Sequence, residues 1–538
     1  MKKNLLCFLL IIPGFYLIAQ QPKHSALYDL VTEKSNRNAR FVDLDIFKEE
    51  GRENITGIII NCIKISVNKT AATAAFVSKS ELVNINIPFS GKNYLLRLSA
   101  VPINSTGDFS FGIIENGVHK KLSTEQGLHY RGYIDGDPFS MACISFFENG
   151  EVMGVFCNKE GNFNIGRKDN GTGDYVVYNS RDLITPPRYA CGTAELPVSS
   201  GKAAALQNNS TAALPSSPLT APALLCNKVR LYWEADNRLY VNNFGSSLAN
   251  TKNYITGVFN VVASVYQNEG ITIELSDSYV WTTVDPYSNA SSSAGLAGFK
   301  ARWNALGDNF KADLAHLVAG GPSNNGGVAY LLNFDQCNRP YAYGYSNVYA
   351  SYQALPAYSW DVEVLSHETG HNFGSNHTQW CGWNTGPSGT CGSIDNCYAQ
   401  ETAGACTTCP TTTNISTAPP GFKGTIMSYC HLVSGIGIDL MNGFGPLPQA
   451  VIRNNINVAA CLTQGSSWTG SVNTAWENAG NWSCGTIPTV TTDIVIGTGL
   501  ANYPVVNSSA TCRSIKQSPN ANVHVNAGFT LKIVGPPF

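Results

Sequence analysis

Short runs of apolar residues recur along residues 21–190, a pattern that predicts a β-rich section. We expect strands at 58–67, 94–98, 142–147 and 152–157. The last two flank Glu-Asn-Gly-Glu, which predicts a hairpin turn. Cys143 and Cys157 are nearly symmetric about this turn, so the sequence allows a disulfide across the hairpin.

From residue 226 the pattern changes to helices that alternate with strands. Apolar pairs between 254 and 266 are spaced by four, three and four, which predicts a buried helix that stops at Gly270. A second helix is predicted by a further apolar face at Leu296, Phe299 and Trp303. Short apolar runs predict strands at 228–233, 271–275 and 313–318, and an exposed edge strand at 326–331. Such alternation favours an α/β layer.

Two changes of composition divide the chain further. Residues 194–224 are rich in Ala, Ser and Pro, which predicts an exposed linker and a site of proteolysis. After Gly465, three tryptophans lie among Gly, Asn and Thr: Trp468, Trp476 and Trp482. With strands expected at 493–496 and 524–533, this part predicts a small β module with a Cys484–Cys512 disulfide.

The first 20 residues predict an export signal. Lys2 and Lys3 precede an apolar stretch, with cleavage expected near Ala19. The stretch is short for a membrane span, although a membrane anchor is the alternative. The chain has 16 cysteines, and 15 remain once Cys7 leaves with the signal. An odd number in an oxidising compartment implies at least one unpaired thiol. The net charge of −2 gives no reason to expect nucleic acid as a partner.

The candidate chemistry lies in His-Glu-Thr-Gly-His-Asn-Phe-Gly-Ser-Asn-His at 367–377. On a helix, His367 and His371 project from one face, so both can bind one zinc ion. Ser359 is expected to cap the start of this helix. Glu368 lies beside the first histidine and can serve as a general base without binding the metal.

The end of the motif supplies a third ligand. Gly374 can adopt a positive φ angle and turn the chain, which brings His377 back toward the other two histidines. Three histidines leave a coordination position open for water and substrate, which indicates a catalytic zinc site.

The motif resembles the metzincin signature H-E-x-x-H-x-x-G-x-x-H. It is most similar to the adamalysin–reprolysin branch, in which H-E-x-G-H-N-x-G-x-x-H is typical. The resemblance implies that His367, His371 and His377 bind zinc and that Glu368 is the general base. The chain departs from that branch at Thr378, where an aspartate is usual.

A second motif supports the same resemblance. Thr-Ile-Met-Ser-Tyr at 425–429 resembles the metzincin Met-turn, in which Met427 would form a hydrophobic base beneath the zinc. Tyr429 is similar to the tyrosine of astacins and serralysins that can approach the metal. It would either stabilise the oxyanion or be purely structural.

A third motif lies before the linker. Pro-Pro-Arg-Tyr-Ala-Cys-Gly-Thr at 186–193 resembles the cysteine switch of adamalysin and matrixin propeptides, in which the Cys191 thiolate would fill the open zinc position. With Cys7 and Cys191 set aside, 14 cysteines remain, an even number. The alternative is an ordinary disulfide cysteine.

We therefore expect a secreted or cell-surface zinc endopeptidase made as a zymogen, with an α/β (α+β) metzincin catalytic domain of mixed twisted sheet and active-site helix. Its substrate would be a polypeptide bound extended beside the edge strand. The parts are a signal peptide (1–20), a β-rich propeptide (21–193), the linker (194–224), the protease domain (225–464) and a β module (465–538). One Zn²⁺ is expected, and Ca²⁺ is left open.

The rival hypothesis is a secreted adhesion or glycan-binding protein that uses the protease-like domain as a scaffold. The tryptophans after Gly465 motivate it, because exposed aromatic rings suit sugar faces. An intact Glu368 argues against it, since a scaffold has no need of the base.

Overall fold

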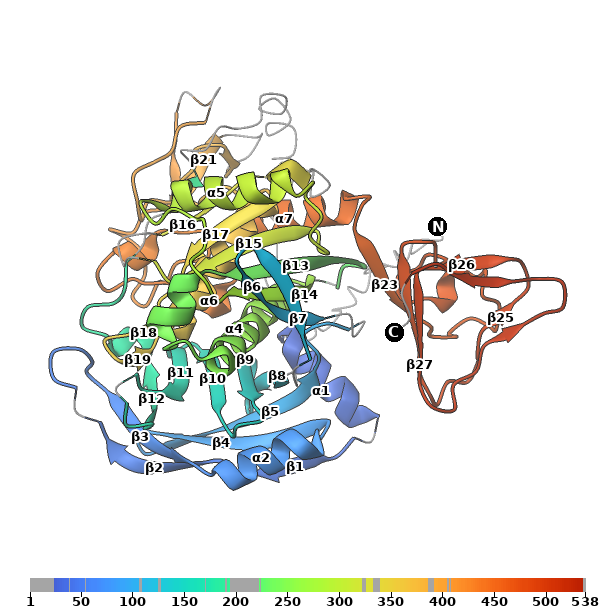
Figure 1. The fold of residues 1–538 in the computed structure, drawn as a ribbon, viewed down its shortest axis with the longest axis horizontal. Coiled ribbons are helices and arrows are strands. Elements are labelled where there is room, and N and C mark those ends of the chain that lie inside the picture. The colour runs from blue at the N-terminus through green and yellow to red at the C-terminus, as the bar shows by residue number, and fades with distance from the viewer. Residues whose placement is uncertain are drawn as a thin grey trace, which may run out of the picture.

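The computed structural model describes residues 24–535 except 38, 54, 106–108, 124–126, 170, 189–190, 194–221, 223, 322–325, 332–338, 386–390, 404–405 and 407. The expected signal peptide and nearly all of the expected linker lie outside the described residues. Two large sheets with helices between them form the body of the molecule (Figure 1).

The N-terminal section forms a curled ten-stranded sheet, with helices α1 (Ala26–Asn36) and α2 (Lys69–Ser78) packed beside it. The strands are β1 (Phe41–Leu44), β2 (Phe47–Arg52), β3 (Cys62–Val67), β4 (Leu82–Phe89), β5 (Lys92–Val101), β8 (Leu128–Ile134), β9 (Asp137–Phe146), β10 (Val152–Asn158), β11 (Gly161–Arg167) and β12 (Tyr175–Asn179). Their order is β1-β4-β5-β8-β9-β10-β11-β12-β3-β2. The predicted hairpin is confirmed as β9–β10, whereas the strand expected from 58 begins only at Cys62, because a turn at Gly57 (φ 80°) precedes it.

The second sheet combines two sections of the chain. Its strands are β13 (Asn227–Ala235), β14 (Thr272–Trp281), β15 (Leu314–Ala319), β16 (Gly327–Ala329) and β17 (Tyr343–Asn347), with β6 (Ser110–Glu115) and β7 (Val118–Leu122) from the N-terminal section. In the order β16-β17-β15-β13-β14-β6-β7, strand β6 pairs with β14 in parallel. The predicted edge strand is confirmed as β16, which pairs antiparallel with β17, but it is buried and not exposed, because Gly192 and Thr193 lie along it.

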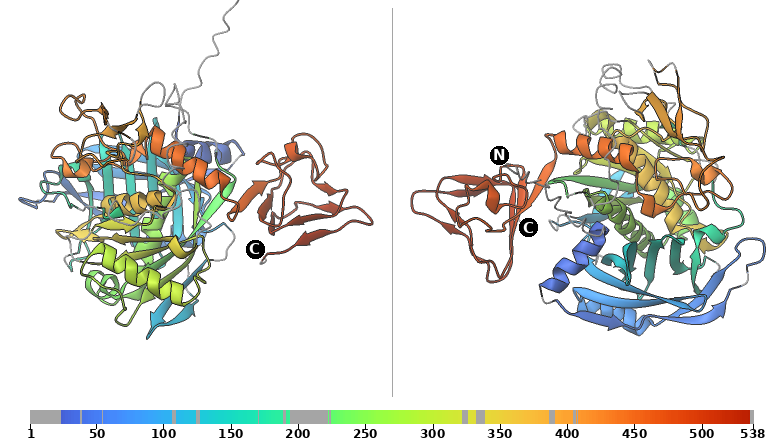
Figure 2. Two further views of the ribbon diagram at one scale, coloured as in Figure 1. Left: turned by 90° about the horizontal axis from the view of Figure 1, so that it is seen from above. Right: turned by 180° about the vertical axis from the view of Figure 1, so that it is seen from behind.

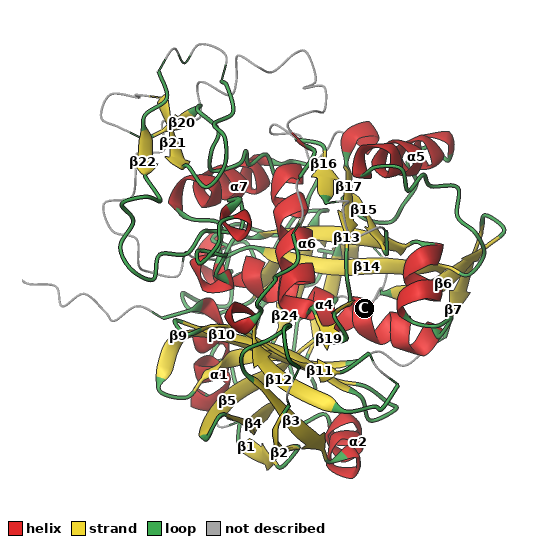
Figure 3. Cartoon of the chain, turned by 90° about the vertical axis from the view of Figure 1, so that its left-hand side faces the viewer, coloured by secondary structure: helices red, strands yellow, loops and turns green. Residues whose placement is uncertain are grey.

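Helices cover both faces of this sheet: α4 (Leu248–Asn268), α5 (Ser292–Ala305) and α6 (Tyr358–Asn372). Neighbouring residues of a strand point to opposite faces. Tyr232 of β13 packs edge-on against Trp303 of α5, while Trp233 packs edge-on against Phe259 of α4. Helix α5 therefore lies on one face, and α4 on the other, where it contacts α6 and lies toward the N-terminal sheet (Figures 1 and 3).

Helix α4 has two chemically different faces. Its apolar face packs on the second sheet, and it ends where predicted, with Gly270 at φ 68°. The face toward the N-terminal sheet is polar or small: Asn260 Oδ1 accepts a hydrogen bond from Arg131 Nε at 2.8 Å. At Gly257, a Cβ atom would lie 2.4 Å from the sulfur of Met153. The contact between the two sections therefore depends on side-chain size on this helix face.

Residues 378–463 form a less regular part held by disulfides. They contain β20 (Trp383–Asn384), β21 (Cys391–Asp395), β22 (Thr411–Thr413) and α7 (Pro446–Val458). The disulfides are Cys381–Cys409, Cys391–Cys406 and Cys397–Cys430, and Cys461 is also disulfide-bonded. Short elements elsewhere are β18 (Ser351–Tyr352), β19 (Leu355–Pro356), η1 (Ser180–Asp182), η3 (Leu239–Asn243), η4 (Arg339–Tyr341), η5 (Cys430–Leu432), η6 (Leu440–Asn442) and η7 (Ala479–Asn481).

The C-terminal module projects from the body and is joined to it by β23 (Thr463–Ser467) (Figure 2). Its other strands are β24 (Thr492–Ile496), β25 (Val505–Val506), β26 (Ala510–Cys512), β27 (Ser514–Gln517), β28 (His524–Val525) and β29 (Leu531–Ile533). They pair in parallel as β24–β27, β25–β28 and β26–β29, while β23 pairs with both β13 and β24. The strand expected at 524–533 is thus two strands, separated by a turn at Gly528 (φ 89°).

Three expectations for the module and the cysteines are wrong. Cys484 pairs with Cys226, and Cys512 is a free, buried thiol. Cys143 and Cys157 are also free, because the register of β9 and β10 places Val155, and not Cys157, opposite Cys143. The tryptophans Trp468, Trp476 and Trp482 are 0–3% exposed and form the core of the module. These three tryptophans are therefore not exposed rings that could bind a sugar.

Within the described ranges, no helix combines the length and the apolar character that crossing a membrane requires.

The packing at α4 gives a direct test of how the two sections meet. Gly257→Ala should lower the free energy of unfolding of the full-length protein by about 1–3 kcal/mol, because the new methyl group meets Met153. At an open helix position, the same change would stabilise by about 1 kcal/mol. Chemical denaturation measures the difference. In a Met153→Ala background the loss should disappear, and simple additivity of the two changes would contradict the contact.

Candidate metal centre

The helix that carries the motif is α6, and its start differs from the prediction. Its N-cap is Ala357, which provides no side-chain hydrogen bond, and Ser359 lies inside the first turn. Asn164 of the N-terminal section caps the helix instead. Its Oδ1 accepts from the Ser359 amide at 2.8 Å, and its Nδ2 donates to Ser359 Oγ at 3.0 Å. The helix that positions the site is thus completed by a residue almost 200 positions earlier.

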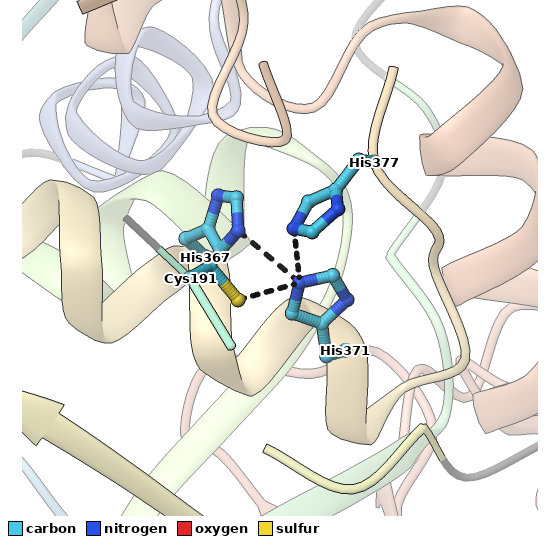
Figure 4. Close-up of side chains that lie close together, drawn as sticks. All are labelled: Cys191, His367, His371 and His377. Atoms are coloured by element: carbon cyan, nitrogen blue, oxygen red, sulfur yellow. Dashed lines mark hydrogen bonds between the residues drawn. The ribbon is translucent and has the colours of Figure 1, made fainter. Parts of the chain in front are cut away.

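Three imidazoles converge at the C-terminal end of α6 (Figure 4). His367 and His371 project from one face of the helix, and Gly374 (φ 93°) then reverses the chain so that His377 faces them. The Nε2 atom of His371 lies 3.1 Å from that of His367 and 3.0 Å from that of His377. All three residues are at most 2% exposed.

The hydrogen bonds of the three rings fix which nitrogen carries the proton. Each Nδ1 lies 2.7 Å from an acceptor, namely Ile426 O for His367, Ser375 O for His371 and Glu401 Oε1 for His377. The Nδ1 atoms therefore donate, and three Nε2 lone pairs point at one another. Burial also lowers the pKa of His367 and His371 well below the usual range, which favours neutral rings. This donor set fits a zinc ion, whose charge would offset the repulsion of the lone pairs.

Glu368 lies against the same centre. Its Oε2 is 3.5 Å from both Cys191 Sγ and Thr193 Oγ1, whereas its buried Oε1 has no hydrogen-bond partner among the described residues. Burial raises the pKa of this carboxyl well above its usual value, and the bonds from Cys191 and Thr193 partly lower it. Gly327 of β16 makes the close approach to Glu368 feasible, since a Cβ there would lie 2.1 Å from Oε1.

Cys191 completes the cluster. Its Sγ lies 3.4 Å from His371 Nε2, and the ligand atoms of Cys191, His367, His371 and His377 all lie within 4.8 Å of one another (Figure 4). The geometry matches a zinc site with three nitrogens and one sulfur.

Met427 and Tyr429 lie beneath and beside the imidazoles. Met427 is fully buried, and its sulfur packs against Gly370, where a Cβ would lie 2.8 Å away. Its carbonyl oxygen accepts from the Thr378 amide at 3.0 Å. The hydroxyl of Tyr429 donates to Cys191 O at 2.8 Å and accepts from Cys191 N at 3.0 Å. The turn at 425–429 thus contacts both the helix and the segment that carries Cys191.

Residues 226–433 match the family model Reprolysin_5, described as metallo-peptidase family M12. This match supports a metzincin-like zinc metalloprotease in this part of the chain. Residues 467–535 match a domain of unknown function, DUF8693. Among solved structures, the crystal structure of metalloproteinase-II from Bacteroides fragilis is similar over 56% of this chain and 84% of its own, with 12% identity and a TM-score of 0.30. No curated protein gives a significant match to the chain.

The segment that carries Cys191 runs along the edge of the second sheet. Gly192 N donates to Gly327 O at 2.9 Å, and Thr193 Oγ1 bonds both N and O of Ala329. Upstream, Tyr349 Oη donates to Arg188 O at 3.2 Å. The segment therefore occupies the side of β16 that an added strand would use.

Sequence reasoning missed the residues that support the three-histidine cluster from a distance. Glu401 and Asn164 come from irregular or remote segments, and their roles depend on tertiary contact. The sequence held one indication for Glu401, because it is the only glutamate between 378 and 463. His431, which is close in sequence to Met427, lies outside the three-histidine cluster, with its Nδ1 3.3 Å from Glu363 Oε1.

Proposed function

We propose that the chain is a secreted zinc endopeptidase of the adamalysin–reprolysin type, made as an inactive precursor. One observation carries the proposal: three Nε2 atoms converge on rings whose Nδ1 atoms all have acceptors, beside a buried carboxylate on the same helix. His367, His371 and His377 would hold the zinc. Such an ion supplies Lewis-acid chemistry, because it polarises a scissile carbonyl and lowers the pKa of water.

Glu368 is the general base of this mechanism. Its carboxylate takes the proton of the attacking water and delivers it to the leaving amine. The position supports the role, since Glu368 follows His367 directly on α6 and its Oε1 has no hydrogen-bond partner among the described residues. Departure of Cys191 and Thr193 would clear the space beside Oε2.

Tyr429 is a donor for the oxyanion. In the present arrangement its hydroxyl is engaged with the backbone N and O of Cys191, which places it beside the metal centre. Once that backbone leaves, the hydroxyl is free to donate to the negatively charged oxygen that develops on the substrate carbonyl.

The substrate is a polypeptide that binds as an extended strand beside β16. The bonds from Gly192 to Gly327 and from Thr193 to Ala329 support this mode, because they use main-chain groups of the edge strand. Backbone pairing of this kind tolerates many sequences and requires an unfolded or flexible segment.

Latency follows from Cys191 and from how the N-terminal section docks. The thiol lies where the fourth zinc ligand would be, and Tyr429 holds its backbone. The face of α4 that the section covers carries Gly257 and Asn260, which tolerate water. Cutting the linker would free the segment that carries Cys191 to leave the site, and release of the rest of the section would also require β6 to give up its pairing with β14. The Cys226–Cys484 disulfide would keep the new N-terminus attached to the C-terminal module.

Export is supported by the disulfides of the described residues, which persist in oxidising compartments. A precursor recovered outside the cell should begin just after Ala19, and one that begins at Met1 would contradict signal cleavage.

The adhesion alternative is not favoured, because it assumed exposed tryptophans and the three tryptophans of the module are buried.

The function and its latency are tested together by Cys191→Ser. The uncut variant should cleave an unfolded polypeptide measurably, because no thiol fills the fourth ligand position, while the uncut parent stays silent. A chelator should abolish this activity and added zinc should restore it. Cys512→Ser removes another free thiol far from the site and serves as the control. A Cys191→Ser precursor that is as inactive as the parent would contradict the cysteine-switch role of Cys191.

Tyr429→Phe tests the oxyanion donor in the protein cut at the linker. Losing one such donor typically lowers kcat about 10²–10³-fold, and the zinc content should not change. Tyr398→Phe is the matched control, because Tyr398 packs against the Tyr429 ring from an exposed position. A kcat that equals the control's would assign Tyr429 a structural role only.

A further inference from the structure

The three histidines of the site do not have equivalent partners. His367 and His371 each donate Nδ1–H to a backbone carbonyl, whereas His377 donates to the carboxylate oxygen Oε1 of Glu401 at 2.7 Å. A hydrogen bond to a charged acceptor is roughly twice as strong as one to a neutral acceptor. Glu401 therefore has more influence on its imidazole than either carbonyl has.

His377 is also the histidine with the least regular support. His367 and His371 are fixed by α6, whereas His377 follows the reversal at Gly374 in a segment without helix or strand. Its backbone is held through Trp383, whose Nε1 donates to His377 O at 2.7 Å. That bond does not set the rotation of the ring, which packs against Tyr429 and directs its Nδ1–H to Glu401.

Glu401 is itself held in place. Gln379 Nε2 donates to the same carboxylate oxygen at 2.9 Å, and the Glu401 amide donates to Gln379 O at 3.2 Å. The carbonyl of Glu401 accepts from the Cys381 amide at 2.9 Å, and Cys381 is bridged to Cys409. The side chain is 24% exposed, so the carboxylate keeps partial contact with water while its contact oxygen faces His377.

We propose that Glu401 is a positioning residue for the metal site: it orients His377 and makes its Nε2 a stronger donor toward zinc. The inference rests on the proposed function, since it concerns the same zinc site. Partners behind metal-binding histidines commonly change metal affinity about 10–100-fold when they are removed. The disulfide-rich part at 378–463 thus contributes to metal retention through one carboxylate.

The test measures zinc affinity in the full-length Cys191→Ser chain, so that the thiol adds no ligand. Competition with a chromophoric chelator gives the dissociation constant for zinc alone. Glu401→Ala should weaken zinc binding about 10–100-fold. Glu401→Gln, whose amide oxygen still accepts a neutral hydrogen bond, should fall between Glu401→Ala and the parent.

The matched control is Gln400→Ala. Gln400 bonds Ser393, Cys409 and Thr411 in the same part of the chain, so its loss loosens that part without touching His377. Its zinc affinity should equal that of the parent. The visible spectrum of the cobalt-substituted protein should change in Glu401→Ala and not in the control, because the field of the third ligand changes.

The outcomes separate this inference from the proposed function. If the parent binds zinc and Glu401→Ala binds it equally well, or if Gln400→Ala weakens binding as much, the positioning role is wrong and the zinc site remains. A parent that binds no zinc would overturn the proposed function and this inference with it.

Discussion

The site depends on one constraint: three imidazole nitrogens with free lone pairs point at the same small volume. Such an arrangement is unfavourable unless a cation occupies it and each ring is held by its other nitrogen. The three acceptors come from the turn after α6 (Ser375), the turn at 425–429 (Ile426) and the disulfide-rich part (Glu401). Much of the local architecture serves to bring these three segments to one end of one helix.

The N-terminal section is built into the same structure. It adds β6 to the edge of the second sheet, caps α6 through Asn164 and places Cys191 against His371. In the proposed zymogen, the covering section therefore both blocks the centre and completes the fold around it. The face of α4 toward this section is polar or small, whereas Phe111 and Ile114 of β6 belong to the core of the second sheet.

Local sequence patterns predicted the elements that carry the site. The helix at 254–266 and the edge strand near Gly327 follow from periodicity, and the turn at Gly374 follows from residue type, and all three are confirmed. The grouping of His367, His371, His377 and Cys191 follows from spacing and from the metzincin resemblance, and the structure places their ligand atoms together.

What the sequence could not predict depends on long-range contact. The disulfide partner of Cys484 is 258 residues away at Cys226, and the cap of α6 comes from Asn164. The tryptophans of the C-terminal module looked like an exposed binding surface, because composition does not distinguish exposed rings from a small aromatic core. Glu401 is a single charged residue in an irregular segment, so only its contact with His377 reveals its role.

The most direct test of the central claim is the zinc content and peptidase activity of the protein cut at the linker, parent beside Glu368→Ala. About one zinc per chain is expected in both proteins. Cleavage by the parent should fall about 10²–10⁴-fold in the variant, because only the base is removed. A zinc-loaded Glu368→Ala protein as active as the parent would contradict the assigned base, and no zinc in either protein would contradict the metal site itself.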